Sequence, residues 1–295
     1  MKKIILLILT MLLIPYMIIV FLTKDNNQIE VRIKKENNEI ITVELEEYII
    51  GVLAGEMPSS FNIEALKAGA VASRSYVLKK MQNNDKDYDV VDTVMNQVYL
   101  DELKLKEKYG ENYKEKIQRI EQAVKITKGE YLSYNDEIVE ALYFSTSTGK
   151  TENVEEVFNE YLPYLRSVDS SWDSEVSPIF SETNTFSLNE FYEKLGLPIK
   201  EKLNYQILET TSTGRIKKIK IDDREFSGSE FAKKLGLKSN YFEIMIFDTN
   251  VLITTKGYGH GVGMSQYGAE AMAEKGYKYD EILKYYYQNV EIKKI

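Results

Sequence analysis

Residues 63–81 read IEALKAGAVASRSYVLKKM, and this stretch predicts a helix with Asn62 as a possible cap. At 100° per residue one arc of the helix is apolar and holds Leu66, Ala70, Val77, Leu78 and Met81. Arg74 falls near the middle of that arc, where a cation needs an anion or carbonyl groups to offset its desolvation. The helix is therefore expected in the core. Arg74 either enters a cleft at the end of the arc or is a structural arginine bound by backbone carbonyls.

Further helices and strand hairpins flank this helix on both sides. Helices are predicted at 46–54, with Gly55 as the stop, and at 112–127, 265–274 and 279–287. Strand pairs are predicted at 29–33 with 39–43, and within 131–144, 205–221 and 243–255, with a last strand near Val290. Because the strands come in hairpins and not between crossover helices, the sequence predicts an α+β fold of antiparallel hairpins with packed helices.

One internal repeat lies within the second half of the chain. Residues 186–197 read FSLNEFYEKLGL and residues 226–237 read FSGSEFAKKLGL, with eight of twelve positions identical. Each copy contains Ser-x-x-Glu, the pattern of a capping box. We expect two similarly capped helices that serve as scaffold, with a possible subdomain over residues 180–255.

The first residues predict a membrane anchor. Ile4 to Leu22 is uncharged, follows Lys2 and Lys3, and would span about 28 Å as a helix. A cleaved signal peptide would need a shorter apolar core and small residues at a cleavage site, which the sequence after Phe21 lacks. Residues 1–24 are therefore predicted as a cytoplasmic stub and single transmembrane anchor in the cell membrane, and residues 25–295 as a domain outside it.

Composition argues against two classes of function. The formal net charge of -8 disfavours general electrostatic binding of nucleic acid. With no cysteine and the single histidine His260, the chain lacks the residues of a conventional zinc site, and we expect no metal or cofactor.

The stretch VLAGEMP at residues 52–58 carries the candidate acid. Glu56 follows a helix stop, precedes Pro58 and has the apolar neighbours Met57 and Phe61. An apolar pocket raises a carboxyl pKa, and a general acid has to hold its proton near pH 7. The alternative is a solvated residue at a helix end, since glutamate is mostly exposed.

Three further stretches carry polar groups suited to a sugar. Hydroxyl residues crowd LYFSTSTGKTEN at 142–153, including Ser145 and Thr146, although such a run is often an ordinary turn. In YLPYLRSV at 161–168, Tyr164 and Arg166 would share one face of an extended segment, unless this is an exposed strand edge. Alternating glycines in 256–269 surround His260, which is either structural or at the cleft.

The order of GEMP, EALKAGAVASRSY, YFSTSTGKTEN, PYLRSV and GYGHGVGMSQYGA resembles the stage II sporulation protein D family from about Leu45 to the C-terminus. The resemblance implies a membrane-anchored peptidoglycan lytic transglycosylase that acts in forespore engulfment on denuded glycan strands. Glu56 matches the catalytic glutamate, and Arg74 matches a conserved arginine. Tyr164 and Arg166 match a Tyr-x-Lys pair tied to activity, with arginine in place of lysine. Substrate binding is also expected from Ser145, Thr146, His260, Gln266 and Tyr267.

The resemblance also implies partners. They are peptidoglycan glycan strands, the amidase stage II sporulation protein P, which removes stem peptides, and the membrane protein stage II sporulation protein M, with no nucleic acid. Some family members bind zinc through cysteines near the Ser-Thr-Ser stretch, and this chain lacks those cysteines.

A mechanism with one carboxyl is expected. Glu56 would protonate the glycosidic oxygen and then take a proton from the muramic C6 hydroxyl, which gives a 1,6-anhydro end without water. Arg74 or Arg166 is expected to hold the lactyl carboxylate of the substrate. The alternatives are a non-catalytic, glycan-binding enhancer of a wall amidase, and a hydrolase with Asp169 or Asp173 as second acid.

Overall fold

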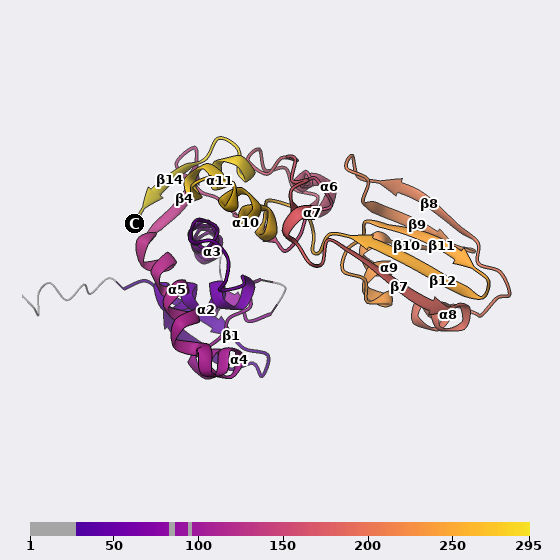
Figure 1. Cartoon of the computed structure of the whole chain (residues 1–295), viewed down its shortest axis with the longest axis horizontal. Coiled ribbons are helices and arrows are strands. Elements are labelled where there is room, and N and C mark those ends of the chain that lie inside the picture. The colour runs from indigo at the N-terminus through magenta and orange to yellow at the C-terminus, as the bar shows by residue number, and fades with distance from the viewer. Residues whose placement is uncertain (1–27, 83–85, 94–95) are drawn as a thin grey trace, which may run out of the picture.

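The computed structural model describes residues 28–82, 86–93 and 96–295, and it has a mixed α+β fold with mainly antiparallel sheets. Two separate hydrophobic clusters fill it. The elements around them form two bodies side by side (Figure 1). Residues 28–180 and 257–295 surround the larger cluster and are named the main lobe. Residues 181–256 surround the smaller cluster and are named the second lobe.

No helix within the described ranges has both the length and the apolar character needed to cross a membrane. The predicted anchor at residues 4–22 lies outside the described residues.

Helix α3 (Ile63–Gln82) is the centre of the main lobe, as its sequence predicts. Asn62 caps it, because its side-chain oxygen accepts from the Glu64 N–H at 3.0 Å. The helix contacts α2 (Leu45–Glu56), α5 (Tyr113–Ile126), β4 (Glu130–Tyr134), α10 (Gln266–Glu274) and α11 (Tyr279–Tyr286). Figure 1 shows these elements around it. The C-terminal helices therefore return to pack on the N-terminal ones.

Short sheets and helices complete the main lobe. One sheet has the order β2-β1-β3 and another β14-β4-β5, while β13 pairs with β6 in parallel. The remaining elements are β1 (Glu30–Lys34), β2 (Ile40–Glu44), β3 (Val90–Val91), α4 (Glu102–Tyr109), the 3-10 helix Gly110–Asn112, β5 (Glu137–Ile138), β6 (Tyr143–Phe144), α6 (Val154–Phe158), α7 (Asp173–Val176), β13 (Met264–Ser265) and β14 (Glu291–Lys294).

The second lobe is built from the sequence repeat. Its elements are β7 (Ser181–Ser187), α8 (Leu188–Leu195), β8 (Tyr205–Thr210), β9 (Ile216–Ile221), β10 (Arg224–Ser227), α9 (Gly228–Leu235), β11 (Phe242–Phe247) and β12 (Asn250–Lys256). The serines of both repeats cap their helices, because the Ser187 and Ser227 side chains accept from the N–H groups of Glu190 and Glu230. The two repeats are therefore two β-α-β-β units.

The two units exchange their first strands. β7 pairs with β12 of the other unit, and β10 pairs with β9, which gives the sheets β11-β12-β7 and β10-β9-β8. The repeat in the structure therefore includes the strands and their pairing, and not only the two capped helices that the sequence predicts.

Two sequence predictions about local structure are wrong in part. The hairpin predicted over 131–144 ends at Ile138, and β6 pairs in parallel with β13. The helix predicted to stop at Gly55 continues to Glu56, with Met57 as its C-cap. Glu56 therefore stands on a helix end and not in a loop.

Candidate functional site

A cleft of about 870 Å³ opens in the main lobe, and Glu56 lines it. Ser145, His260 and Gln266 also line this cleft, so the structure brings together four of the residues predicted from the sequence. Segments far apart in the chain therefore meet here: the end of α2, the segment after β6, the glycine-rich loop and the start of α10.

Two glycines of α2 position Glu56. A Cβ on Gly55 would lie 2.5 Å from the Val98 carbonyl oxygen, and one on Gly51 would lie 2.7 Å from that of Leu100. Only glycine allows residues 98–100 to lie this close to the helix. In that position the Val98 N–H donates to Glu56 Oε1 at 2.9 Å. Gly55 is thus required for close packing and not for helix termination.

The half-buried Glu56 carboxyl has a raised pKa. Desolvation is the largest cause, and it outweighs the Val98 N–H, the Gln266 side chain and the charge of Lys108, which all favour the carboxylate. Burial therefore favours the protonated acid, while the same donors are in place to stabilise the anion once the proton has left. This combination suits a general acid that is regenerated.

Gln266 reaches Glu56 from the first turn of α10. Ser265 caps that helix, since its Oγ accepts from the Gly268 N–H at 3.1 Å and donates to the Asp173 carboxylate. Asp173 is fully buried and also accepts from the Ser147 N–H and the Ser170 hydroxyl. Asp173 thus fixes the start of α10, and Gln266 is placed to orient Glu56.

His260 belongs to an aromatic wall of the cleft. Its ring lies 5.7 Å from the Phe144 ring and 5.4 Å from the Phe158 ring. The Val262 N–H donates to His260 Nδ1 at 3.1 Å. Desolvation and the Arg215 charge lower the pKa of His260 to about 4, so the ring is neutral at pH 7. It offers the cleft a flat uncharged surface.

Arg74 is not among the residues that line the cleft, and its role in substrate binding stays a prediction. Its side chain is fully buried. Nε and Nη2 donate to the two oxygens of Glu46 at 3.0 and 2.6 Å, and Nη1 donates to the Glu130 carbonyl oxygen at 2.9 Å. These contacts favour the alternative interpretation of a structural arginine, with a carboxylate as well as a carbonyl group as its partners.

Tyr164 and Arg166 also lie outside the lining of the cleft, with their polar groups engaged elsewhere. The Tyr164 hydroxyl accepts from the Glu140 N–H at 3.2 Å. The Arg166 guanidinium binds both oxygens of Glu155 and stacks 4.7 Å from the centre of the Tyr161 ring. In this structure neither arginine is free to hold a lactyl carboxylate.

Thr146 and Tyr267 have structural contacts as well. Thr146 is fully buried, and its backbone exchanges two hydrogen bonds with Tyr258. Tyr267 packs against Phe61 with ring centres 5.1 Å apart. Neither residue lines the cleft.

Sequence reasoning missed several residues of the cleft. Tyr143 lies beside Glu56, and its hydroxyl accepts from the Gln97 side chain at 2.9 Å. Lys80 forms an ion pair with Glu140 at 2.5 Å, and Phe158 and Tyr258 add partly exposed rings. Tyr143 and Tyr258 stand within the quoted motifs. Their aromatic side chains in these motifs could have indicated a sugar-binding surface.

Comparisons with known proteins agree with the motif order. The SpoIID family, described as "Stage II sporulation protein", matches residues 34–134. Stage II sporulation protein D of Bacillus subtilis (strain 168) is 42% identical over 262 residues, which are 87% of this chain and 76% of that protein. The protein of that name from Bacillus amyloliquefaciens is 42% identical over 265 residues, 88% of this chain and 77% of that protein. The Amidase enhancer of Bacillus subtilis (strain 168) is 30% identical over a 291-residue alignment that covers 80% of this chain and 39% of that protein. The chain therefore belongs to the stage II sporulation protein D family.

Proposed function

We propose that this sporulation-family protein is a peptidoglycan lytic transglycosylase with Glu56 as its acid, held at the cell membrane by residues 4–22. The observation that carries the proposal is the position of Glu56. It lies in the wall of a large cleft, with a pKa raised by desolvation. The rings of Phe158, Tyr258 and His260 line the same cleft and suit the flat faces of sugars.

Glu56 carries a proton in both directions. It protonates the oxygen between N-acetylmuramic acid and N-acetylglucosamine, and the bond from the muramic C1 to that oxygen breaks. The muramic C6 hydroxyl oxygen then bonds to C1, and its proton returns to the Glu56 carboxylate. Between these steps Val98 and Gln266 stabilise the carboxylate by donating hydrogen bonds to it. The acid is regenerated and no water is consumed.

The hydrolase alternative loses the two acids that were suggested for it. Asp173 is fully buried and binds Ser147, Ser170 and Ser265, and Asp169 is absent from the cleft lining. The amidase enhancer alternative keeps one observation in its favour, the 30% identity to a protein of that name. In that case the cleft would bind glycan without cutting it.

The test is digestion of denuded glycan by the wild-type chain and by the Glu56→Gln variant. We expect anhydro ends from the wild type by mass spectrometry and a loss of at least about 1000-fold in the variant, which keeps the shape but has no transferable proton. Reducing ends would indicate a hydrolase, and a lack of any product would indicate an enhancer.

The Glu56→Gln variant should remain folded. The raised pKa means that ionisation of Glu56 costs folding free energy, and this cost is absent below the unfolded pKa and builds as pH rises to the folded one. The variant should therefore gain stability relative to the wild type at pH 8 and lose that advantage at pH 4. Thermal melting at both pH values separates lost chemistry from lost structure.

A further inference from the structure

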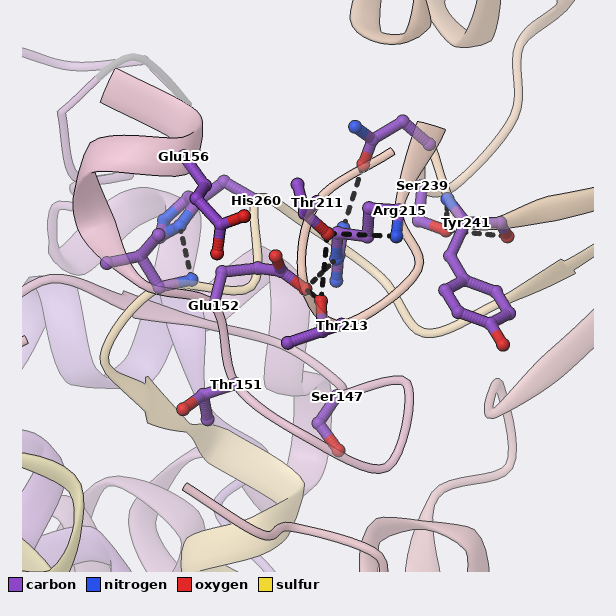
Figure 2. A network of polar contacts seen from close by, with 12 residues as sticks. Ser147, Thr151, Glu152, Glu156, Thr211, Thr213, Arg215, Ser239, Tyr241 and His260 are labelled. Carbon is purple, nitrogen blue, oxygen red and sulfur yellow. Dashed lines mark hydrogen bonds and ion pairs between the residues drawn. The ribbon is translucent and has the colours of Figure 1, made fainter. Parts of the chain in front are cut away.

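The turn between β8 and β9 of the second lobe reaches the main lobe next to the glycine-rich loop. Figure 2 shows Thr213 and Arg215 of this turn beside Glu152, with His260 nearby. Thr213 Oγ1 donates to Glu152 Oε1, and Arg215 Nε lies 3.2 Å from that oxygen. Arg215 and Glu152 are both fully buried. A buried charge pair therefore joins the two lobes at this point.

Arg215 also binds the backbone of the loop that carries His260. Its Nη1 donates to the Gly259 carbonyl oxygen at 2.8 Å and to Asn240 Oδ1 at 3.0 Å. A Cβ on Gly261 would lie 2.8 Å from Arg215 Nη2, and Gly261 has a φ of +86°. Glycine at this position thus allows the guanidinium to lie against the loop on both sides of His260.

The main lobe holds the same loop from the other side. The Glu152 N–H donates to the Gly261 carbonyl oxygen at 2.7 Å. A second contact fixes the turn itself, because the Ser212 N–H and hydroxyl both donate to Glu156, at 2.7 and 2.6 Å. The loop is therefore clamped between Glu152 and Arg215.

A gain in stability does not by itself explain why Glu152 and Arg215 form a buried ion pair. Desolvation of two charges offsets most of their attraction, so buried ion pairs add little to stability compared with apolar residues. Arg215 Nη2 and Glu152 Oε2 are buried, and neither has a hydrogen-bond partner among the described residues. The pair does define one relative position of the turn and the loop, since each charge is costly without the other.

Arg215 is the charged group that lowers the pKa of His260, and the other groups packed against the ring are uncharged. β6 contributes the Tyr143 backbone and the Phe144 ring, and α6 contributes the Phe158 ring, all uncharged. The two nearby acids face the turn, where Glu152 binds Thr213 and Arg215 and Glu156 binds Ser212.

We infer that Arg215 is a positioning residue for the cleft: from the second lobe, it holds the Gly259–Gly261 backbone so that the His260 ring stands in the cleft wall. The inference deepens the proposed glycan site and rests on it for the identity of the ligand. The hold on His260 itself does not depend on cleavage.

The test uses the single histidine as a reporter. The full chain, purified with a histidine-free tag and labelled with ¹³C-histidine, gives one imidazole signal, which we expect to titrate at about 4 in the wild type. Arg215→Met removes the neighbouring positive charge and should move this midpoint up, toward 6.5. Arg215→Lys keeps the charge but loses the planar group, so its midpoint should lie between the two.

Two further variants keep the test decisive. Arg215→Met leaves Glu152 buried without its counter-charge, so Glu152→Gln/Arg215→Met removes both charges at once. Arg224→Met is the matched control, because Arg224 is an exposed arginine of β10 that stacks on Phe226 in the same lobe. Near-ultraviolet circular dichroism of the tyrosines, phenylalanines and Trp172, which lie in both lobes, reports whether each variant is folded.

The folded double variant should show the raised histidine midpoint and about tenfold weaker binding of denuded glycan, while Arg224→Met matches the wild type. If the chain cleaves glycan, the loss should appear in KM, with the pH dependence of kcat unchanged because Glu56 sets it. A folded double variant with a wild-type histidine titration and wild-type glycan affinity would overturn the inference. Absence of anhydro products would remove only the proposed reaction and leave the titration result standing.

Discussion

The chemistry proposed for Glu56 depends on a balance between burial and three groups that favour its anion. One of these groups is Lys108, whose Nζ also donates to the Ala54 carbonyl oxygen of α2, at 2.8 Å. Its positive charge lowers the pKa of Glu56, although desolvation keeps the net shift upward. The alkaline limit of activity should therefore respond to this lysine.

Lys108→Met should shift the alkaline limb of the pH profile upward. Removing a positive charge disfavours the carboxylate, so Glu56 keeps its proton to higher pH and remains an acid there. The profile of kcat against pH measures this. Lys106→Met, on the same helix and paired with Glu102, is the control and should leave the limb in place. An unmoved limb in Lys108→Met, or an equal shift in both variants, would contradict the prediction.

Arg74 differs from Glu56 and Lys108, because its contacts are those of a structural residue and its loss should change stability. Arg74→Met would leave Glu46 and the Glu130 carbonyl without their partner, at a cost of about 3–5 kcal/mol in the free energy of unfolding. Urea denaturation measures this cost, and Glu46→Gln/Arg74→Met should recover part of it. Lys218→Met, at an exposed pair with Glu225, is the control and should cost no more than about 1 kcal/mol. An Arg74→Met variant that is as stable as the wild type but inactive would contradict the structural role and support the predicted role of Arg74 in substrate binding.

At the scale of elements, the sequence predicted what local rules determine. The periodicity of 63–81 predicted α3, the turns at Thr213-Gly214 and Asp248-Thr249 predicted the hairpins of the second lobe, and Ser187 and Ser227 were recognised as caps. These features depend on neighbours within a few residues. They can therefore be predicted from the sequence without knowledge of the rest of the fold.

Contacts between segments that are far apart in the chain could not be predicted in this way. Gly55 resembles a helix stop until Val98, 43 positions later, is seen to occupy the space of its side chain. Arg74 and Arg166 had the charge expected for substrate, but their partners Glu46 and Glu155 come from other elements. The parallel pairing of β6 with β13 joins residues 121 positions apart. Such pairings depend on tertiary packing, which overrides local preference.

At the scale of the molecule, the two lobes are joined where the chain enters and leaves the second one. Ser181 and Lys256 are partners in the β7–β12 ladder, and the Gly257 N–H donates to the Phe180 carbonyl oxygen at 2.8 Å. The ends of the second lobe therefore lie side by side, and the chain can be closed there without crossing the main lobe. Removal of the second lobe also takes Ser212 from Glu156 at the surface and the Lys238 carbonyl oxygen from the Gly259 N–H. Glu152 needs repair, because without Arg215 its charge would be buried and unpaired.

We accordingly predict that a short glycine linker can replace residues 182–255 when Glu152→Gln is introduced as well. The main lobe keeps its own hydrophobic cluster with α3 at its centre, so it should unfold in one cooperative transition, as should residues 181–256 expressed alone. Its affinity for denuded glycan should fall about as far as in Glu152→Gln/Arg215→Met, because both lack the clamp on the loop of His260. Circular dichroism melts and glycan binding measure the two effects. An unfolded main lobe would mean that the lobes are one folding unit, and a much larger loss of affinity would mean that the second lobe contacts glycan directly.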